Sequence, residues 1–582
     1  MKLESLSKTQ AFIAVLLLTA ALAAWPMRSG LFYGKMVGAG PDVATTLWTM
    51  WWFQAEWAGA AWGGESYLFN FPWGGSGAIL SPITAVTWAL SEPIIGPARA
   101  GALTSWSQVW LFGLSLYWLA REVGLTRASS SIVILATFTQ RYLFFGVGET
   151  SVVGITALPI VIGLVALIKL SKCKRISLWV LIAATCMALQ PLENPYLTPV
   201  LPGVALLLLV RREGRKATLI SLLVGIVAMI VVGGIHQGAT TLAYESTRPD
   251  SYVGFGSLQW PAIERPWARA PVTWMLFPPE TIWSTGTDQS IWAQGREYLG
   301  LSVIALAALG VKKYKTRALP WLGFGLIGIV FATGSDWFGL PGPFAFLNAI
   351  CIRLVRALTQ PTRYLVLSNI GLAIAAGWGF QWILEKRRHW ANRIALFMIA
   401  DAFLLGGLSL KLPDMTIPTP SCLDILEDER GGVLVWPWDG ADQVHPDATV
   451  ESRMMQVAHG KPGATIGTGS WPLTGRVFPG HLLRRAGWEE GFSGGTGHMD
   501  LVTVSNWGYR WVVADLTAPP EILGEPNEFF GEPYASCNGA SIHEMPEADG
   551  SNSPLSRRDF SYAPVGDDAP DSEASGGGTH GY

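Results

Sequence analysis

Acidic and basic side chains at the borders of apolar segments are the residues that could do chemistry in this sequence. Asp42 lies in Gly40-Pro41-Asp42, shortly after the first apolar segment. A carboxylate there could act as a general base toward a hydroxyl group, or bind a divalent cation that neutralises a diphosphate-type leaving group. The alternative is that Asp42 caps a helix beginning near Val43, because aspartate is a preferred N-cap residue. The two roles can coexist.

Two kinds of side chain could assist such a carboxylate. Arg363 precedes an apolar segment, and it is a candidate ligand for a lipid phosphate because a guanidinium binds phosphate oxygens bidentately. The alternative is that the Arg363 side chain only snorkels to the membrane interface. Glu149 and Glu193 lie in short loops between apolar segments. They could line one cavity with Asp42, or be loop carboxylates in contact with water.

The C-terminal region contributes one further polar motif, His459-Gly460-Lys461-Pro462. His459 and Lys461 could bind a saccharide or a phosphate group, and a turn that shapes the region explains the same residues equally well. The eight histidines show no zinc-ligand spacing such as HExxH, so no metal site is assigned from them. The divalent cation at Asp42 is the single cofactor that the residues suggest.

The chain that positions these side chains is strongly apolar. Half of its 582 residues are hydrophobic and only 14% are charged, a composition outside the usual range of soluble globular domains. The formal net charge is −2, and the sequence has no zinc-finger, helix-turn-helix or RNA-recognition pattern. Nucleic acid is therefore not an expected partner, whereas membrane lipids are.

Eleven apolar segments among the first 410 residues approach the length of about 20 residues that crosses a bilayer. They lie near residues 9–25, 100–120, 129–146, 151–169, 177–190, 196–210, 217–235, 298–311, 319–333, 364–384 and 394–410. The sequence therefore predicts a polytopic α-helical membrane protein with about 11 transmembrane helices.

Lys and Arg cluster in five short loops, each separated from the next by two predicted crossings. The clusters are Arg121 and Arg127; Lys169, Lys172, Lys174 and Arg175; Arg211, Arg212, Arg215 and Lys216; Lys312, Lys313, Lys315 and Arg317; and Lys386, Arg387, Arg388 and Arg393. Because cytoplasmic loops are enriched in Lys and Arg, all five loops and the N-terminus are predicted to be cytoplasmic. An odd number of crossings then places the residues after 410 on the extracytoplasmic side.

Three stretches leave alternatives to this path. Residues 78–95 and 340–355 contain prolines and are predicted to be membrane-surface or re-entrant helices, but a full crossing at 78–95 would place Arg121 outside. The first apolar segment is predicted to be an uncleaved helix. Ala21-Leu22-Ala23 resembles a cleavage site, which keeps a secretory signal as the alternative.

The chain divides into three predicted parts: a transmembrane domain at 1–410 with extracytoplasmic loops at about 26–77 and 236–297, a small C-terminal extracytoplasmic α/β domain at 411–546, and a disordered tail at 547–582. Aromatic residues recur at helical offsets between 43 and 60, which predicts an amphipathic helix on the membrane surface. The α/β domain has predicted strands at 433–437 and 508–514. Cys422 and Cys537 could pair there.

Short motifs, taken in their order along the chain, resemble bacterial GT-C-type membrane glycosyltransferases, in particular large relatives with a C-terminal extracytoplasmic domain. Asp42 matches the position of the acidic residue that follows the first helix in this class. Similar segments recur in these relatives at Tyr298-Leu299-Gly300-Leu301, Pro361-Thr362-Arg363-Tyr364 and Gln456-Val457-Ala458-His459-Gly460-Lys461-Pro462. One departure is that Asp42 lacks the adjacent second acidic residue of several enzymes of this class.

The resemblance implies a GT-C-like fold, a place in the bacterial inner membrane and a glycosyltransferase activity. Such enzymes take a polyprenyl-phosphate-linked sugar as donor, so a lipid-linked sugar is the expected partner and a glycan, lipid or protein the expected acceptor. Asp42 would be the base or the cation ligand. Two alternatives are a non-catalytic assembly or export factor for lipid-linked glycans and a transporter, although the sequence shows no duplicated half and no P-loop.

Overall fold

The computed structural model describes residues 7–38, 41–55, 65–66, 75–77, 81–144, 157–172, 178–193, 197–210, 214–247, 298–333, 336–337, 340–341, 361–410, 412, 414–415, 420–436, 455–456, 470–472, 505–506, 508–515 and 530–547. The chain folds into two compact units. Unit 1 comprises Met1–Trp57, Ala78–Ala239 and Pro249–Ile417, and unit 2 comprises Ala58–Gly77, Thr240–Arg248 and Pro418–Tyr582. The predicted domain borders at 410 and 546 stay predictions.

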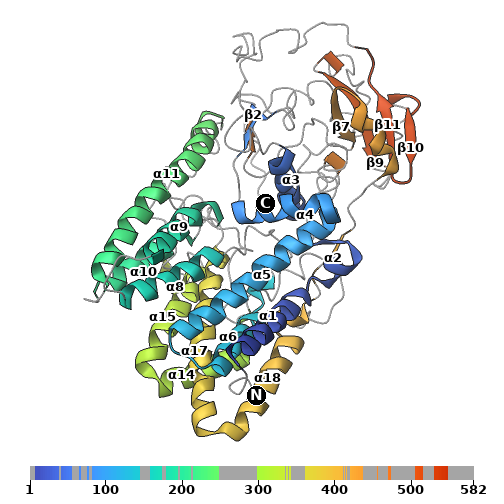
Figure 1. The fold of residues 1–582 in the computed structure, drawn as a ribbon. Coiled ribbons are helices and arrows are strands. Elements are labelled where there is room, and N and C mark those ends of the chain that lie inside the picture. Colours follow the sequence, from blue (N-terminus) through green and yellow to red (C-terminus); the bar gives the residue numbers. More distant parts are fainter. Residues whose placement is uncertain are drawn as a thin grey trace. The chain divides into compact units, whose positions relative to one another are not determined.

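Unit 1 is helical (Figure 1). Its helices are α1 (Lys8–Ala24), α2 (Arg28–Tyr33), α3 (Pro41–Ala55), α4 (Pro82–Ile95), α5 (Pro97–Glu122), α6 (Arg127–Thr139), α8 (Leu158–Lys172), α9 (Leu178–Glu193), α10 (Val200–Leu208), α11 (Arg215–Thr247), α14 (Leu301–Lys313), α15 (Lys315–Ala332), α17 (Leu365–Lys386) and α18 (Arg388–Leu404), with 3-10 turns η8 (Pro361–Tyr364) and η9 (Gly407–Ser409). Short strand pairs join β1 (Met36–Val37) to β6 (Asp414–Met415) and β4 (Asp336–Trp337) to β5 (Leu340–Pro341).

Each of the eleven predicted apolar segments overlaps one of these helices. Within the described residues, Arg215–Val232 of α11 and Leu365–Lys386 are long and apolar enough to cross a membrane by length and composition, while Thr9–Ala24, Ile83–Ile95 and Leu178–Glu193 are shorter apolar helices. The count of about eleven crossings therefore stays a prediction.

Helix α17 is the centre of unit 1. Almost all of its residues are buried, and it packs against α14, α15 and α6. Glycines make close approaches between helices: a Cβ atom on Gly379 would collide with the Leu306 carbonyl oxygen of α14, and one on Gly371 would collide with the Gly325 nitrogen of α15. Small residues at such crossings let two helix backbones touch, which is a typical way to pack helices in a bilayer.

The outer faces of peripheral helices expose large apolar side chains. Phe12 and Leu17 on α1 are 56% and 61% exposed, and Val227 and Ile230 on α11 are 61% and 63% exposed. Exposed apolar surface of this kind is unfavourable in water and suits contact with lipid. The packing therefore agrees with a membrane as the surroundings of unit 1.

The five Lys- and Arg-rich loops meet at one end of unit 1, here called the basic end. Side-chain contacts join the loops there, namely Lys169 with Glu122 (2.8 Å), the Thr126 N–H with Gln381 (3.0 Å) and the Tyr314 hydroxyl with Glu385 (2.6 Å). The loop at 211–216 joins through Gly214, where a Cβ atom would collide with the Leu170 carbonyl oxygen. Loop charge thus predicted which helix ends lie together, and the assignment of this end to the cytoplasm stays a prediction.

Unit 2 contains a four-stranded sheet of order β10-β11-β9-β7, built from β7 (Gly432–Trp436), β9 (Tyr509–Asp515), β10 (Ala535–Cys537) and β11 (Ala540–Glu544). Strands β7 and β9 are parallel and the other pairs antiparallel. Residues 433–437 and 508–514, the predicted strands, correspond to β7 and β9. A second sheet has the order β2-β3-β8, from Glu65–Ser66, Gly75–Gly77 and Ser470–Pro472.

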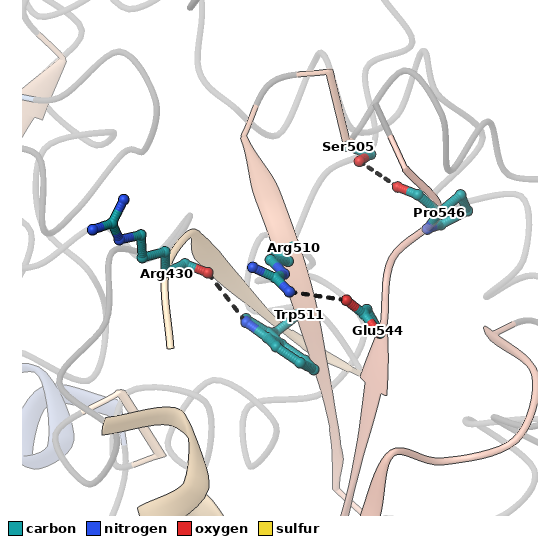
Figure 2. A network of polar contacts seen from close by, with 6 residues as sticks. All are labelled: Arg430, Ser505, Arg510, Trp511, Glu544 and Pro546. Atoms are coloured by element: carbon teal, nitrogen blue, oxygen red, sulfur yellow. Dashed lines mark hydrogen bonds and ion pairs between the residues drawn. The ribbon is translucent and has the colours of Figure 1, made fainter. Parts of the chain in front are cut away.

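The 3-10 helix η10 (Ser421–Asp428) packs on the four-stranded sheet and is tied to it by a disulfide between Cys422 and Cys537, which confirms the suggested pairing. Figure 2 shows polar contacts that close one end of the sheet: the Trp511 indole N–H donates to the Arg430 carbonyl (3.2 Å), and Arg510 pairs with Glu544 (3.2 Å). The buried apolar side chains of the sheet and η10 form a small core of their own.

Candidate functional site

Asp42 is the second residue of α3, because the helix begins at Pro41 rather than near Val43. The N-cap alternative for Asp42 therefore misplaces the helix start. Proline is favoured in the first turn of a helix because its fixed φ suits the turn and it has no N–H to leave unsatisfied. A carboxylate in the first turn still benefits from the positive end of the helix dipole. The Asp42 side chain itself lies outside the described part of the structure.

The aromatic residues of α3 pack into the protein rather than covering it. Trp48, Trp52 and Phe53 are almost completely buried, and Trp51 is half-buried beside Trp48. The structure describes the predicted helix over Pro41–Ala55, and the prediction of a membrane-surface helix was wrong for this aromatic face. Helical spacing reports which side chains share a face and does not distinguish lipid from protein as the neighbour of that face.

Glu193 is fully buried at the end of α9. Its carboxylate accepts hydrogen bonds from the Ser81 hydroxyl (2.5 Å) and the Ile83 N–H (2.9 Å), while the Ser81 N–H donates to the Leu192 carbonyl (3.0 Å). These donors belong to the first turn of α4, where unpaired N–H groups and the helix dipole favour an anion. Through these contacts Glu193 holds the start of α4. The role of Glu193 as a substrate ligand stays a prediction.

Both termini of helix α4 lie on the side of unit 1 opposite the basic end. Its start is bound to Glu193, the last residue of α9, and α9 begins just after the basic end. The C-terminus of α4 is separated from the N-terminus of α5 by Gly96 alone. The C-terminus of α5 carries Glu122, which lies at the basic end. Both termini of α4 therefore lie on the same side of unit 1. This arrangement supports the prediction that 78–95 does not cross.

The start of the Asp42 segment lies at this same opposite end. Trp25, at the end of α1, contacts Phe403 of α18 through their rings (5.9 Å between centroids). Strand β1, which follows α2, pairs with β6, which follows α18. Lys35 forms an ion pair with Asp414 across this pair (2.9 Å). The exits of the first and last helices of unit 1 are therefore held together immediately before α3.

Arg363 also lies at the opposite end. It is in η8, directly before α17, and its side chain is half-buried. The other end of α17 carries Glu385 at the basic end, and near its start the Asn369 carbonyl accepts a hydrogen bond from Gln140 (3.3 Å) at the end of α6. The fold thus brings the segments of Asp42, Glu193 and Arg363 to one end of unit 1.

A buried polar network at this end was not predicted. Asp401 of α18 accepts hydrogen bonds from the Tyr298 hydroxyl (2.6 Å), the Ser302 N–H (2.9 Å) and the Ser302 hydroxyl (2.5 Å). The Arg141 guanidinium donates to the Leu405 carbonyl (2.6 Å), and the Arg141 N–H donates to the Tyr298 carbonyl (3.0 Å). The signal in the sequence was an ionisable residue inside each of two predicted spans, 129–146 and 394–410.

The network also interrupts a predicted span, since helical backbone resumes at residues 142–144 beyond the break. Helix α6 ends at Thr139, where Gln140 turns to an extended backbone conformation, although the apolar segment continues to 146. Arg141, buried among the carbonyl groups of other segments, takes the place at which the helix would have continued. Long-range partners of this kind leave no local pattern in the sequence.

The remaining predicted site residues lie elsewhere. Glu149, His459 and Lys461 fall outside the described residues. Among the side chains that the structure describes, no group of three His, Cys, Asp or Glu residues could hold a metal ion. The Asp42 side chain is not among these described side chains, and the cation at Asp42 stays a prediction.

Known structures resemble the chain over most of its length. The arabinofuranosyltransferase AftD from Mycobacteria matches 94% of this chain with a TM-score of 0.54 and 14% identity. An oligosaccharyltransferase from Archaeoglobus fulgidus matches 86% of this chain and 68% of its own, with a TM-score of 0.46 and 13% identity. ArnT from Cupriavidus metallidurans matches 92% of this chain and 98% of its own, with a TM-score of 0.38 and 13% identity.

The likeness to AftD shows that the chain has a GT-C-like fold, which confirms the fold that the sequence motifs implied. The chain spans 40% of the length of AftD. No family model matches the sequence, and no curated protein matches it.

Proposed function

We propose that this GT-C-like chain is a membrane glycosyltransferase that transfers a sugar from a polyprenyl-phosphate-linked donor to an extracytoplasmic glycan, lipid or protein. The observation that carries the proposal is the gathering of the Asp42 helix, the α4 helix and Arg363 at the end of unit 1 opposite the basic loops. With the basic loops in the cytoplasm, that end faces outward. The setting would be a bacterial inner membrane.

The neighbourhood of Asp42 suits a lipid-borne donor. Helix α4, which packs on α3, presents an apolar stripe of Val86, Leu90 and Ile94, of which Leu90 and Ile94 are 72% and 81% exposed. These residues recur at intervals of four and therefore share one face of the helix. An apolar stripe beside the Asp42 helix could contact a polyprenyl chain, while polar side chains at the same end meet the phosphate and the sugar.

In the proposed reaction Asp42 accepts the proton of an acceptor hydroxyl, and the hydroxyl oxygen forms a bond to the anomeric carbon of the sugar. The bond from that carbon to the phosphate oxygen breaks, and polyprenyl phosphate leaves with the bonding electrons. Arg363 would bind the departing phosphate, whose charge increases in the transition state. One base and one stabilised leaving group suffice for a single displacement.

Further ligands belong to the same proposal. Glu149 and Glu193 would border the sugar, and His459 and Lys461 would bind saccharide or phosphate. A divalent cation at Asp42 would stabilise the phosphate charge. Loss of transfer in a chelator, with recovery on adding Mg²⁺ or Mn²⁺, would support the cation, and unchanged transfer would remove it.

The test is to replace Asp42 by Asn and to measure transfer from polyprenyl-phosphate sugars in membranes. A general base contributes roughly 10²- to 10⁴-fold, so the rate should fall by that factor. Asp424→Asn, the same change at an exposed aspartate of η10, is the matched control and should leave transfer unchanged. Unchanged transfer by Asp42→Asn would remove Asp42 from the mechanism. Wild-type protein that binds the donor but never transfers the sugar would favour a non-catalytic assembly or export factor.

A further inference from the structure

The strand pair β1–β6 joins the segment that follows α2 to the segment that follows α18. Met36 stands opposite Met415 and Val37 opposite Asp414 in an antiparallel register. The ion pair between Lys35 and Asp414 (2.9 Å) closes the pair at the side of α2. About 380 positions separate the partners in sequence, so the contact fixes a point that the chain connectivity alone leaves free.

Strand β6 has a firm support on one side. It follows α18 and η9, and the turn between them is bound by Arg141, whose guanidinium donates to the Leu405 carbonyl (2.6 Å) and to the Ser409 hydroxyl (3.4 Å). Asp401 of the same network receives three hydrogen bonds from Tyr298 and Ser302. Leu408 and Leu412, which flank this route, are almost completely buried.

Strand β1 leads directly to α3. Val37 is packed against Gly30 and is almost fully buried, Gly38 adopts a φ of 99°, and α3 begins at Pro41. A φ in this range favours glycine, so the chain turns at a defined place between β1 and α3. Asp42 is seven positions from Lys35, so we expect a displacement of β1 to change where the chain enters α3.

We propose that the Lys35–Asp414 ion pair and the β1–β6 strand pair position the Asp42-bearing end of α3 for the transfer reaction. Lys35 and Asp414 are positioning residues: they act through the strand pair and are not expected to touch the substrate. The inference rests on the proposed function of Asp42. The buried network of Arg141 and Asp401 holds β6 in place. The partly exposed ion pair connects β6 to Lys35, beside β1.

The Lys35 side chain is 47% exposed and that of Asp414 is 17% exposed. Exposed pairs of this kind contribute little to global stability, so substitutions here can change the position of α3 without unfolding the protein. A displacement of about 1 Å at a reacting group lowers rates by up to about 100-fold. The expected effect is therefore on the rate of transfer more than on donor binding.

The experiment is a charge reversal in full-length protein in membranes. Asp414→Lys should lower kcat by roughly 10- to 100-fold with KM for the donor nearly unchanged. The double variant Lys35→Asp with Asp414→Lys restores an ion pair of opposite direction and should recover most of the lost kcat. The matched control is Glu122→Lys alone and with Lys169→Glu, which reverses a pair of similar length (2.8 Å) at the basic end and should leave kcat unchanged.

Unchanged kcat in Asp414→Lys, in protein whose Asp42→Asn variant is inactive, would overturn the inference while the proposed function stands. Equal losses in the single and double reversals would also overturn it, because the ion pair would not be the cause. Hydrogen exchange of α3 amides gives a readout that is independent of transfer. Faster exchange in Asp414→Lys, reversed in the double variant, supports the inference even for protein without transferase activity, and unchanged exchange refutes it.

Discussion

Replacing Glu193 by Ala should loosen helix α4 while the rest of unit 1 stays folded. The buried Glu193 carboxylate accepts hydrogen bonds from the Ser81 hydroxyl (2.5 Å) and the Ile83 N–H (2.9 Å). In Glu193→Ala the Ser81 hydroxyl keeps its contact with the Thr84 hydroxyl (2.5 Å), but the Ile83 N–H loses its hydrogen bond to the carboxylate.

The size of the effect follows from these contacts. Two hydrogen bonds to a charged group contribute about 1.5 to 3 kcal/mol each. Removing the carboxylate also removes a desolvation cost of several kcal/mol, so the net loss should be about 2 kcal/mol. At about 1.4 kcal/mol for each factor of ten, this corresponds to a roughly 30-fold increase in local opening. Glu193→Gln keeps an acceptor for the Ile83 N–H and should cost about half as much in free energy.

Hydrogen exchange of membrane-embedded protein, followed on peptides that cover Pro82–Ile95, measures this opening. Glu122→Ala serves as control, because Glu122 also stands at a helix end but is paired with Lys169 at the basic end, and it should leave α4 exchange unchanged. Exchange of α4 in Glu193→Ala equal to that of the wild type would refute the reasoning. Equal effects of the Ala and Gln variants would refute its electrostatic part.

Two predictions concern unit 2. Reducing the Cys422–Cys537 disulfide, whose cysteines are 115 positions apart, should destabilise unit 2 by about 2 to 5 kcal/mol; thermal unfolding with and without dithiothreitol measures this, and identical transitions would contradict it. Burial lowers the pKa of His543, with the Gly531 carbonyl and Glu532 acting in the opposite sense. The unfolded chain then binds a proton more readily, so unit 2 should lose stability as pH falls below about 6.5. Urea unfolding at several pH values should show this dependence, weakened in His543→Gln; equal dependence in both proteins would exclude His543.

The positions of the helices could be predicted from the sequence because runs of apolar residues report local structure directly. The shared end of the five basic loops could also be predicted, since loop charge and the parity of crossings are properties of chain order. The place of Asp42 after the first helix followed in the same way. Each of these inferences needs only the neighbours of a residue along the chain.

Contacts between distant segments could not be predicted. The two-residue strands β1 and β6 are too short for an alternating pattern, and they pair across about 380 positions. Arg141 stands in an apolar stretch, and its partners at the end of α6, the carbonyl groups of Leu405 and Tyr298, come from distant segments. Trp48 and Trp52 are buried in a helix that packs on α4, and α3 alone would suit a membrane surface equally well.

The enclosure of α17 bears on how the chain reaches its final state in a bilayer. The helices around it are synthesised at different times: α6, α14 and α15 before it, and α18 after it. Until α18 arrives, one side of α17 lacks its final neighbour, whereas its polar groups already meet earlier segments: the Ser368 hydroxyl donates to the Gly325 carbonyl of α15, and Gln381 accepts from the Thr126 N–H. Helix α17 thus completes its contacts only after the synthesis of α18. Helix α18 leads into β6, which pairs with β1 just before the Asp42 segment.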